Sequence, residues 1–220
     1  MYPLENNIYF VSGIDTGIGK TYVTGFLARR WNKLGCRTIT QKLIQTGNTG
    51  VSEDIELHRQ LMGSDMMEED NERLTMPEIY SYPCSPHLAA EIDKRPLDLK
   101  KIHLATLALS QRYDAVLLEG AGGLMVPLSR DFLTIDYISQ HHYPVILVTS
   151  GRLGSINHTL LSLEAIASRN IHLHTLAYNL YEDRDGDDII RNDTKQYIKD
   201  FVSHHFPNAQ FLEIPVITTP

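Results

Sequence analysis

The chain has 220 residues, of which 42% are hydrophobic and 21% charged, as expected for one globular domain with a substantial core. A formal net charge of −7 argues against a surface that binds nucleic acid or another polyanion. The apolar runs are too short to span a bilayer, and Met1–Tyr9 lacks the cationic start and apolar stretch of a secretory signal. Cys36 and Cys84 have neither metal nor redox spacing, so we expect two free thiols in a cytoplasmic protein.

Short β-rich runs alternate with longer helical stretches along the chain. Strands are predicted at residues 8–11, 37–42, 115–118, 144–149, 173–179 and 210–214. Helices are predicted from Thr21 to a stop at Gly35, over 54–61 and 98–112, from Ser155 as a capping residue, and over 187–206. Strands separated by helices imply right-handed crossovers. We therefore predict a single doubly wound α/β domain over residues 1–220, with a mainly parallel sheet and helices on both faces.

The first predicted strand leads into a glycine-rich turn followed by Lys20 and Thr21. Glycines let backbone N–H groups converge on phosphate oxygens, and the start of the next helix adds its positive end. Lys20 would reach the β- and γ-phosphates of ATP, and the hydroxyl of Thr21 would coordinate Mg²⁺. The turn departs from the common P-loop pattern, because Ile14 occupies the place of the first glycine and Gly13 comes one residue early.

Polar residues of matching chemistry follow other parts of the predicted sheet. Lys42 ends the second strand, where an ammonium group can offset charge on a transferring phosphoryl group, although a lone lysine there is usually a surface residue. Glu119 follows the third strand and precedes a glycine-rich turn, which places a hard oxygen ligand for Mg²⁺ beside the nucleotide. Asp54 lies at a helix start, where an acid can equally complement the helix dipole.

The segment Gly-x-Asp-Thr-x-x-Gly-Lys-Thr at residues 13–21 resembles the P-loop of the dethiobiotin synthetases, a family with a deviant P-loop. Further matches to that family occur in order at residues 42–47, 83–87, 119–123, 151–157 and 213–215, with Leu43 replacing a family proline. The resemblance extends from Tyr9 to Pro215. It implies ATP- and Mg²⁺-dependent ring closure of 7,8-diaminononanoate with CO₂, through a carbamate and a carbamic-phosphoric anhydride.

The resemblance also implies a role for each matching residue. Lys20 and Lys42 would offset phosphoryl charge, and Thr16 and Thr46 would hydrogen-bond the carbamate. The Mg²⁺ ligands would be Thr21, Asp54 and Glu119. The nucleotide would contact Gly13, Asp15, Thr16, Gly17, Ile18, Gly19, Lys20, Thr21, Glu119, Gly122, Asn179 and Pro215, with Asn179 at the adenine. The diamine would contact Lys42 and Thr46, and its carboxylate would contact Gly151, Leu153, Gly154, Ile156 and Asn157 from the other subunit of a homodimer.

Two other classes of protein share some of these features. A switch ATPase with a protein partner uses a similar loop, but such proteins usually carry a second lysine near Gly13, where Ile14 and Asp15 stand. An amide-forming ligase fused to a glutaminase would need a nucleophilic cysteine in a strand–turn context and a longer chain.

The ten histidines, with adjacent pairs at 141–142 and 204–205, are expected to be solvated surface residues, and residues 183–188 a solvated acidic loop. The sequence indicates no role for Tyr181 or Arg184.

Overall fold

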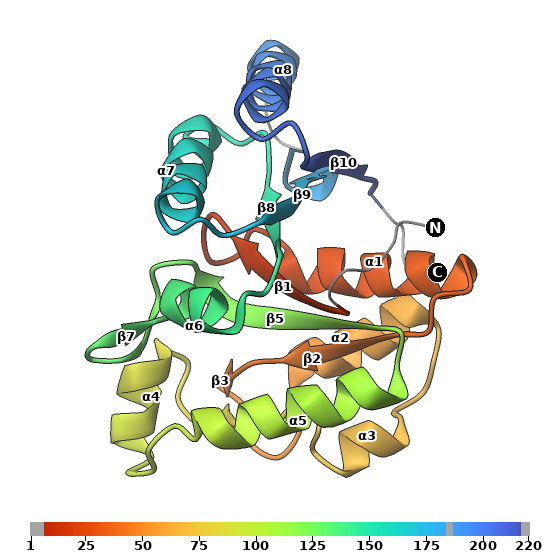
Figure 1. Cartoon of the computed structure of the whole chain (residues 1–220), viewed down its shortest axis with the longest axis vertical. Coiled ribbons are helices and arrows are strands. Elements are labelled where there is room, and N and C mark those ends of the chain that lie inside the picture. Colours follow the sequence, from red (N-terminus) through yellow and green to blue (C-terminus); the bar gives the residue numbers. More distant parts are fainter. Residues whose placement is uncertain (1–6, 184–186, 217–220) are drawn as a thin grey trace.

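The computed structural model describes residues 7–183 and 187–216. Its centre is a six-stranded sheet in the order β10-β9-β8-β1-β5-β2, and every pairing within it is parallel (Figure 1). The strands are β1 (Ile8–Gly13), β2 (Thr38–Lys42), β5 (Ala115–Gly123), β8 (Val145–Thr149), β9 (Leu173–Asn179) and β10 (Gln210–Ile214). The predicted α/β class and the six predicted strands are confirmed.

Helices cover both faces of this sheet. They are α1 (Lys20–Lys33), α2 (Glu53–Met62), α3 (Glu68–Asn71), α4 (Pro86–Ile92), α5 (Leu99–Arg112), α6 (Thr134–His141), α7 (Ser155–Ser168) and α8 (Asp188–His205), with the 3₁₀ turn η1 (Leu180–Asp183) before α8. Because right-handed crossovers lead from β1 to β2 in one direction and from β5 to β10 in the other, α1 lies opposite α6, α7 and α8. Figure 1 shows this arrangement, with α2 beside α1.

Several details differ from the sequence-based expectation. Strand β5 runs to Gly123 rather than stopping before Glu119, because the glycine-rich stretch still pairs with β1, Glu119 with Val11 and Gly123 with Gly13. The capping position of helix α7 is Gly154, which has a left-handed φ of 95°. Ser155 is therefore the first residue of the helix and not its cap. The small sheets β3–β4 (Gln45–Thr46, Ile79–Tyr80) and β6–β7 (Pro127–Ser129, Phe132–Leu133), and helices α3 and α6, were not predicted.

The sheet forms the core because it is covered on both faces. Strands β1 and β8 are buried along their whole length, which is why they read as continuous apolar runs rather than alternating ones. Cys36 and Cys84 are free thiols, as expected. No helix within the described ranges is both long and apolar enough to cross a bilayer. Because β5 lies between β1 and β2 in the sheet, the carboxyl ends of these three parallel strands lie side by side.

Candidate nucleotide and cation site

The loop between β1 and α1 has the backbone geometry of an anion cradle. Gly17 and Gly19 have φ of 72° and 86°, in the left-handed region that favours glycine. A Cβ on Gly13 would lie 2.5 Å from a methyl carbon of Ile18, so the turn leaves no room there for a side chain. Gly19 precedes α1 and has no side chain that could cap the helix. The first N–H groups of α1 can therefore donate hydrogen bonds to a phosphate.

Four side chains from four different elements meet beside this loop. The Oγ1 atom of Thr21 on α1 lies 2.8 Å from Oδ1 of Asp54 on α2 and 3.1 Å from Oε1 of Glu119 on β5. The Nζ atom of Lys42 on β2 donates to the same Oε1 of Glu119 at 2.8 Å and also forms an ion pair with Asp54. The structure therefore brings together the three predicted Mg²⁺ ligands and one predicted catalytic lysine.

The second predicted lysine, Lys20, is the first residue of α1 and directly follows the loop. The Nζ atom of Lys20 donates to the backbone oxygen of Asp15 at 3.1 Å, so the side chain curls back over the loop. Burial lowers the pKa of Lys20 to about 8, with Lys42 adding to the effect and Glu119 opposing it. An anion bound in the loop would therefore add negative charge beside the Lys20 ammonium, which the protein itself compensates only in part.

The charges of Lys42 and Glu119 sustain each other. Burial raises the pKa of the Glu119 carboxyl, but Lys42 and His58 outweigh that effect and bring the pKa well below its ordinary value. Burial likewise lowers the pKa of Lys42, but Glu119 and Asp54 outweigh it, so this pKa lies above its ordinary value. Both groups are thus charged inside the protein, and Glu119 is available as an anionic ligand.

The donor set suits a small, hard cation. Two carboxylates and one hydroxyl oxygen converge, and Mg²⁺ takes few protein ligands of this kind and completes its shell with phosphate oxygens and water. Among residues 7–183 and 187–216, no group of three His, Cys, Asp or Glu side chains could hold a metal alone. The cluster therefore fits a cation that arrives with a phosphate ligand.

His58 contradicts the expectation that all ten histidines are solvated, and His174 is also half-buried. His58 on α2 is fully buried, and its Nε2 atom lies 2.8 Å from Oε2 of Glu119. The prediction is wrong here because α2 packs closely on α1, where a Cβ on Gly25 would lie only 3.3 Å from Cα of His58. The sequence held one cue, since His58 follows Asp54 by four residues and so shares its helix face.

The predicted adenine contacts lie at the other side of the loop. Asn179 is fully buried at the end of β9, where its Nδ2 donates to the oxygen of Ile18 at 3.0 Å and its Oδ1 accepts from the N–H of Tyr181 at 3.1 Å. The hydroxyl of Tyr22 on α1 donates to the oxygen of Pro215 at 3.1 Å. Asn179 and Pro215 therefore flank the start of α1. Arg184 and its neighbours 185–186, which belong to the predicted acidic loop, lie outside the described residues.

The predicted substrate loops border the cluster. Gly47, next to Thr46, has a φ of 81°, and a Cβ there would lie 2.9 Å from Cβ of Pro83, so these two loops touch. Thr16 is exposed on the P-loop, and a Cβ on Gly122 would lie 3.6 Å from its Oγ1. The structure thus places Thr16 beside the end of β5, and Thr46 beside the segment that resembles a family substrate loop.

The loop between β8 and α7, together with the first turn of α7, contains the five residues predicted to hold the substrate carboxylate. Arg152 forms an ion pair with Asp15, which ties this junction to the P-loop of the same chain. Leu153 is 85% exposed, Leu161 on α7 is 61% exposed, and Met125 after β5 is 54% exposed. Gly151 is buried and Ile156 is half-buried, whereas Gly154 and Asn157 are exposed. A single chain therefore leaves the apolar rim of this side of the site open to solvent.

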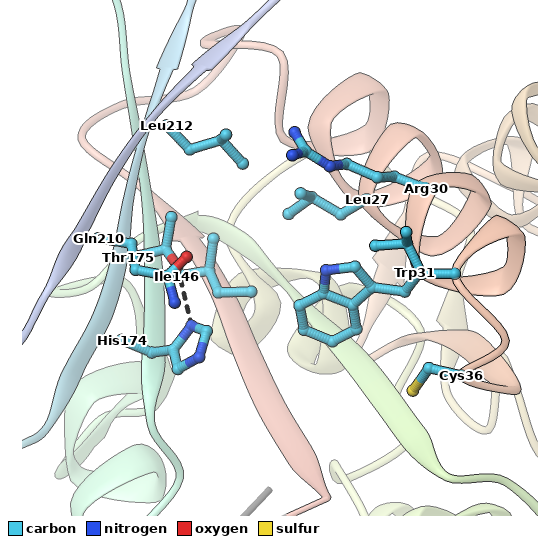
Figure 2. Close-up of a pocket in the computed structure, with 10 residues that line it drawn as sticks. Leu27, Arg30, Trp31, Cys36, Ile146, His174, Thr175, Gln210 and Leu212 are labelled. Carbon is cyan, nitrogen blue, oxygen red and sulfur yellow. Dashed lines mark hydrogen bonds between the residues drawn. The ribbon is translucent and has the colours of Figure 1, made fainter. Parts of the chain in front are cut away.

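A separate cavity of about 280 Å³ lies between α1 and the strands β8–β10 (Figure 2). It is lined by Leu27, Arg30, Trp31, Leu34, Cys36, Ile146, His174, Thr175, Gln210 and Leu212, none of them a predicted site residue. Figure 2 shows Trp31 and His174 on opposite walls, and the ring of Tyr9 packs edge-on against both. Burial lowers the pKa of His174 to about 4, with His172 adding to the effect. We assign the chemistry to the loop cluster, because the cavity holds no comparable set of charged groups.

Comparison with known proteins gives consistent relatives. A family model described as an AAA domain matches residues 7–218. Proteins named ATP-dependent dethiobiotin synthetase BioD 2 from Pasteurella multocida and Haemophilus ducreyi are 46% identical over 211 residues and 50% identical over 205 residues. These alignments cover 96% and 93% of this chain and 98% and 96% of the relatives. The ATP-dependent dethiobiotin synthetase BioD of Chlorobaculum tepidum is 48% identical over 214 residues, 97% of this chain and 87% of its own.

Solved structures support the fold. FtsY from the chloroplast of Physcomitrella patens and FtsY from Thermotoga maritima superpose with TM-scores of 0.55 and 0.56 at 17% and 15% identity. The superpositions cover 100% and 99% of this chain but 62% and 64% of the FtsY chains. At such low identity the likeness concerns the fold alone.

Proposed function

The chain belongs to the dethiobiotin synthetase family, and from that premise we propose that it uses ATP and Mg²⁺ to convert 7,8-diaminononanoate and CO₂ into dethiobiotin. The observation that supports this most directly is the contact of Thr21, Asp54, Glu119 and Lys42 at the mouth of a phosphate-binding loop. The alternative of a switch ATPase is not favoured, because the close relatives carry the name of an ATP-dependent synthetase.

The proposed reaction forms no covalent bond to the protein. One amine of the diamine adds to CO₂, and an oxygen of the resulting carbamate attacks the γ-phosphorus of ATP and releases ADP. The second amine then attacks the carbonyl carbon of the mixed anhydride, which closes the cyclic urea and releases phosphate. The chain's own task is therefore to position the reactants and to stabilise the charge that develops on the transferring phosphoryl group.

Each side chain of the cluster has a part in that task. Lys20 begins α1 directly after the loop and Lys42 ends β2, so the two ammonium groups would flank a γ-phosphate bound at the loop and offset its charge. Thr21, Asp54 and Glu119 would hold Mg²⁺, which supplies Lewis-acid polarisation of phosphoryl oxygens when bound. Thr16 and Thr46, from loops on the substrate side, would hydrogen-bond the carbamate.

We expect the working enzyme to be a cytoplasmic homodimer whose substrate site is shared between subunits. The start of α7, with Gly151, Leu153, Gly154, Ile156 and Asn157, would offer backbone N–H groups to the carboxylate of a diamine bound to the partner subunit. The 85% exposure of Leu153 supports this arrangement, since a second copy would cover it. Neither nucleic acid nor a membrane is expected as a partner.

The direct test is phosphate release from ATP and Mg²⁺ in bicarbonate, with and without 7,8-diaminononanoate, with the product identified by mass. We expect release that depends on the diamine and yields the cyclic urea. Reactions without bicarbonate, or with a monoamine of the same length and carboxylate, serve as controls because neither can close the ring. ATP turnover that ignores the diamine would contradict the proposal and favour a switch ATPase or another ligase.

A further inference from the structure

The two oxygens of Glu119 have different partners. Oε1 faces the loop, where Lys42 donates to it at 2.8 Å and Oγ1 of Thr21 lies at 3.1 Å. Oε2 points the other way and has the Nε2 atom of His58 at 2.8 Å. Glu119 and His58 are both fully buried, so water does not compete for this hydrogen bond. The Glu119 carboxylate is therefore held through Oε1 by residues beside the loop and through Oε2 by His58 on the opposite side.

His58 reaches this place because its helix is fixed at both ends. At the amino end, Oγ of Ser52 caps the helix by accepting from the N–H of Ile55 at 3.2 Å. At the carboxyl end, the buried guanidinium of Arg59 donates to both carboxylate oxygens of Asp70, at 2.9 and 2.7 Å. Asp54 and His58, one helical turn apart, then point to the same side, so one rigid helix presents an anion to the cluster and a ring to Glu119.

The chemistry of the pair fixes the direction of the hydrogen bond. An ionised carboxylate only accepts, so Nε2 of His58 carries the proton and donates to Oε2. The other ring nitrogen, Nδ1, is buried and has no hydrogen-bond partner among the residues that the structure describes. Among the described residues, the only hydrogen bond of the His58 ring is therefore the one to Glu119. This pattern is typical of a group that orients a metal ligand.

We propose that His58 is a positioning residue for the cation site: it holds Glu119 by Oε2 so that Oε1 is presented beside Thr21. Without that contact, the carboxylate is free to rotate and to give both oxygens to the ammonium of Lys42, which lies within hydrogen-bond distance already. This inference rests on the proposed Mg²⁺-dependent function. It adds a residue that acts through its contact with a predicted Mg²⁺ ligand.

The test compares His58→Gln with His58→Asn. The longer amide of Gln carries its nitrogen to about the position of Nε2, whereas that of Asn stops near Nδ1 and cannot reach Glu119. The probe is Mn²⁺, titrated with protein and a non-hydrolysable ATP analogue while the electron paramagnetic resonance signal of the free ion is followed. Titrations with the analogue alone give the cation held by the nucleotide in solution. His58→Leu keeps the volume and removes the donor altogether.

We expect His58→Asn and His58→Leu to bind Mn²⁺ about 10–100-fold more weakly, as for other losses of a group that orients a metal ligand. His58→Gln should stay within about threefold of the original chain. The Mg²⁺ concentration for half-maximal turnover should rise in the same order, while KM for ATP at saturating Mg²⁺ stays nearly constant.

Leu61→Ala is the matched control, because Leu61 lies on the same helix, packs at Gly25 and carries no group that could hydrogen-bond Glu119. It should lower the melting temperature and leave Mn²⁺ affinity unchanged. Equal Mn²⁺ affinities for the Gln and Asn variants, both folded by circular dichroism, would overturn the proposal. If the unmodified chain showed no diamine-dependent turnover yet the two variants differed as expected, the proposed reaction would fail and the role of His58 would stand.

Discussion

Lys42→Met removes the ammonium that contacts Glu119 and Asp54 inside the protein. At the 2.8 Å separation of Lys42 from Glu119, an effective dielectric constant near 20 gives an attraction of about 6 kcal/mol, much of which is spent on desolvating the charges. Removing one partner of such a pair typically costs about 3–5 kcal/mol. We expect that loss of stability, and we expect Mg²⁺ to restore part of it, because the cation supplies the missing positive charge.

The same change separates catalysis from cation binding. The rate should fall about 10²–10³-fold, as when one charge-stabilising donor is lost from a reacting site. Mn²⁺ affinity should not fall, because the ammonium that competes for Glu119 and Asp54 is gone. Urea unfolding with and without Mg²⁺, diamine-dependent phosphate release and Mn²⁺ titration measure the three effects, with Lys42→Arg as the charge-retaining control. Full activity in Lys42→Met, or parallel losses of rate and cation affinity, would refute the assignment of Lys42 as a catalytic group.

Three further changes test other parts of the fold. Gly25→Val should destabilise the chain by about 1–3 kcal/mol in urea unfolding, because its side chain would push Leu61 and α2 away from α1; unchanged stability would contradict the close packing. The original chain should lose about 1–2 kcal/mol of unfolding free energy as the pH falls from 6.5 to 4, a figure discounted for partial exposure, because over that range the unfolded chain binds a proton that the folded His174 ring, with a pKa of about 4, does not. His174→Phe should not show this loss, and parallel pH profiles for the two chains would contradict the expectation. Leu153→Asp should shift sedimentation equilibrium toward the monomer and change stability by less than about 0.5 kcal/mol; an unaltered dimer would place the interface elsewhere.

The sequence was informative wherever local pattern and topology act together. The central strands β1, β5 and β8 each contain a short apolar run, and such runs are conspicuous because both faces of a parallel sheet are buried. Residues at strand ends could then be predicted to meet, since parallel strands bring their carboxyl ends to one edge. Lys42 and Glu119 illustrate this directly: Lys42 ends β2, and Glu119 is its register partner on the adjacent strand β5.

The sequence was less informative where a role depends on packing between helices. His58 lies 61 positions before Glu119, and its four-residue spacing from Asp54 does not by itself distinguish it from an exposed histidine on an amphipathic helix. Its burial follows from the close approach of α1 and α2 at Gly25, a tertiary contact that no local pattern reveals. Strand β5 was predicted too short for a related reason, because glycines weaken strand propensity and the pairing with β1 overrides it.

The proposed roles of Lys42 and His58 make a joint prediction that neither variant tests alone. Both groups hold the carboxylate of Glu119, Lys42 at Oε1 and His58 at Oε2. If His58 prevents Glu119 from turning both oxygens to Lys42, its loss should matter less once Lys42 is gone. In a double-mutant cycle of Mn²⁺ affinity, His58→Asn should therefore cost less in the Lys42→Met background, with a coupling of about 0.5 kcal/mol or more. Costs that agree within about 0.3 kcal/mol in the two backgrounds would mean that His58 acts on Glu119 independently of Lys42, and rotation toward the ammonium would be the wrong account of its effect.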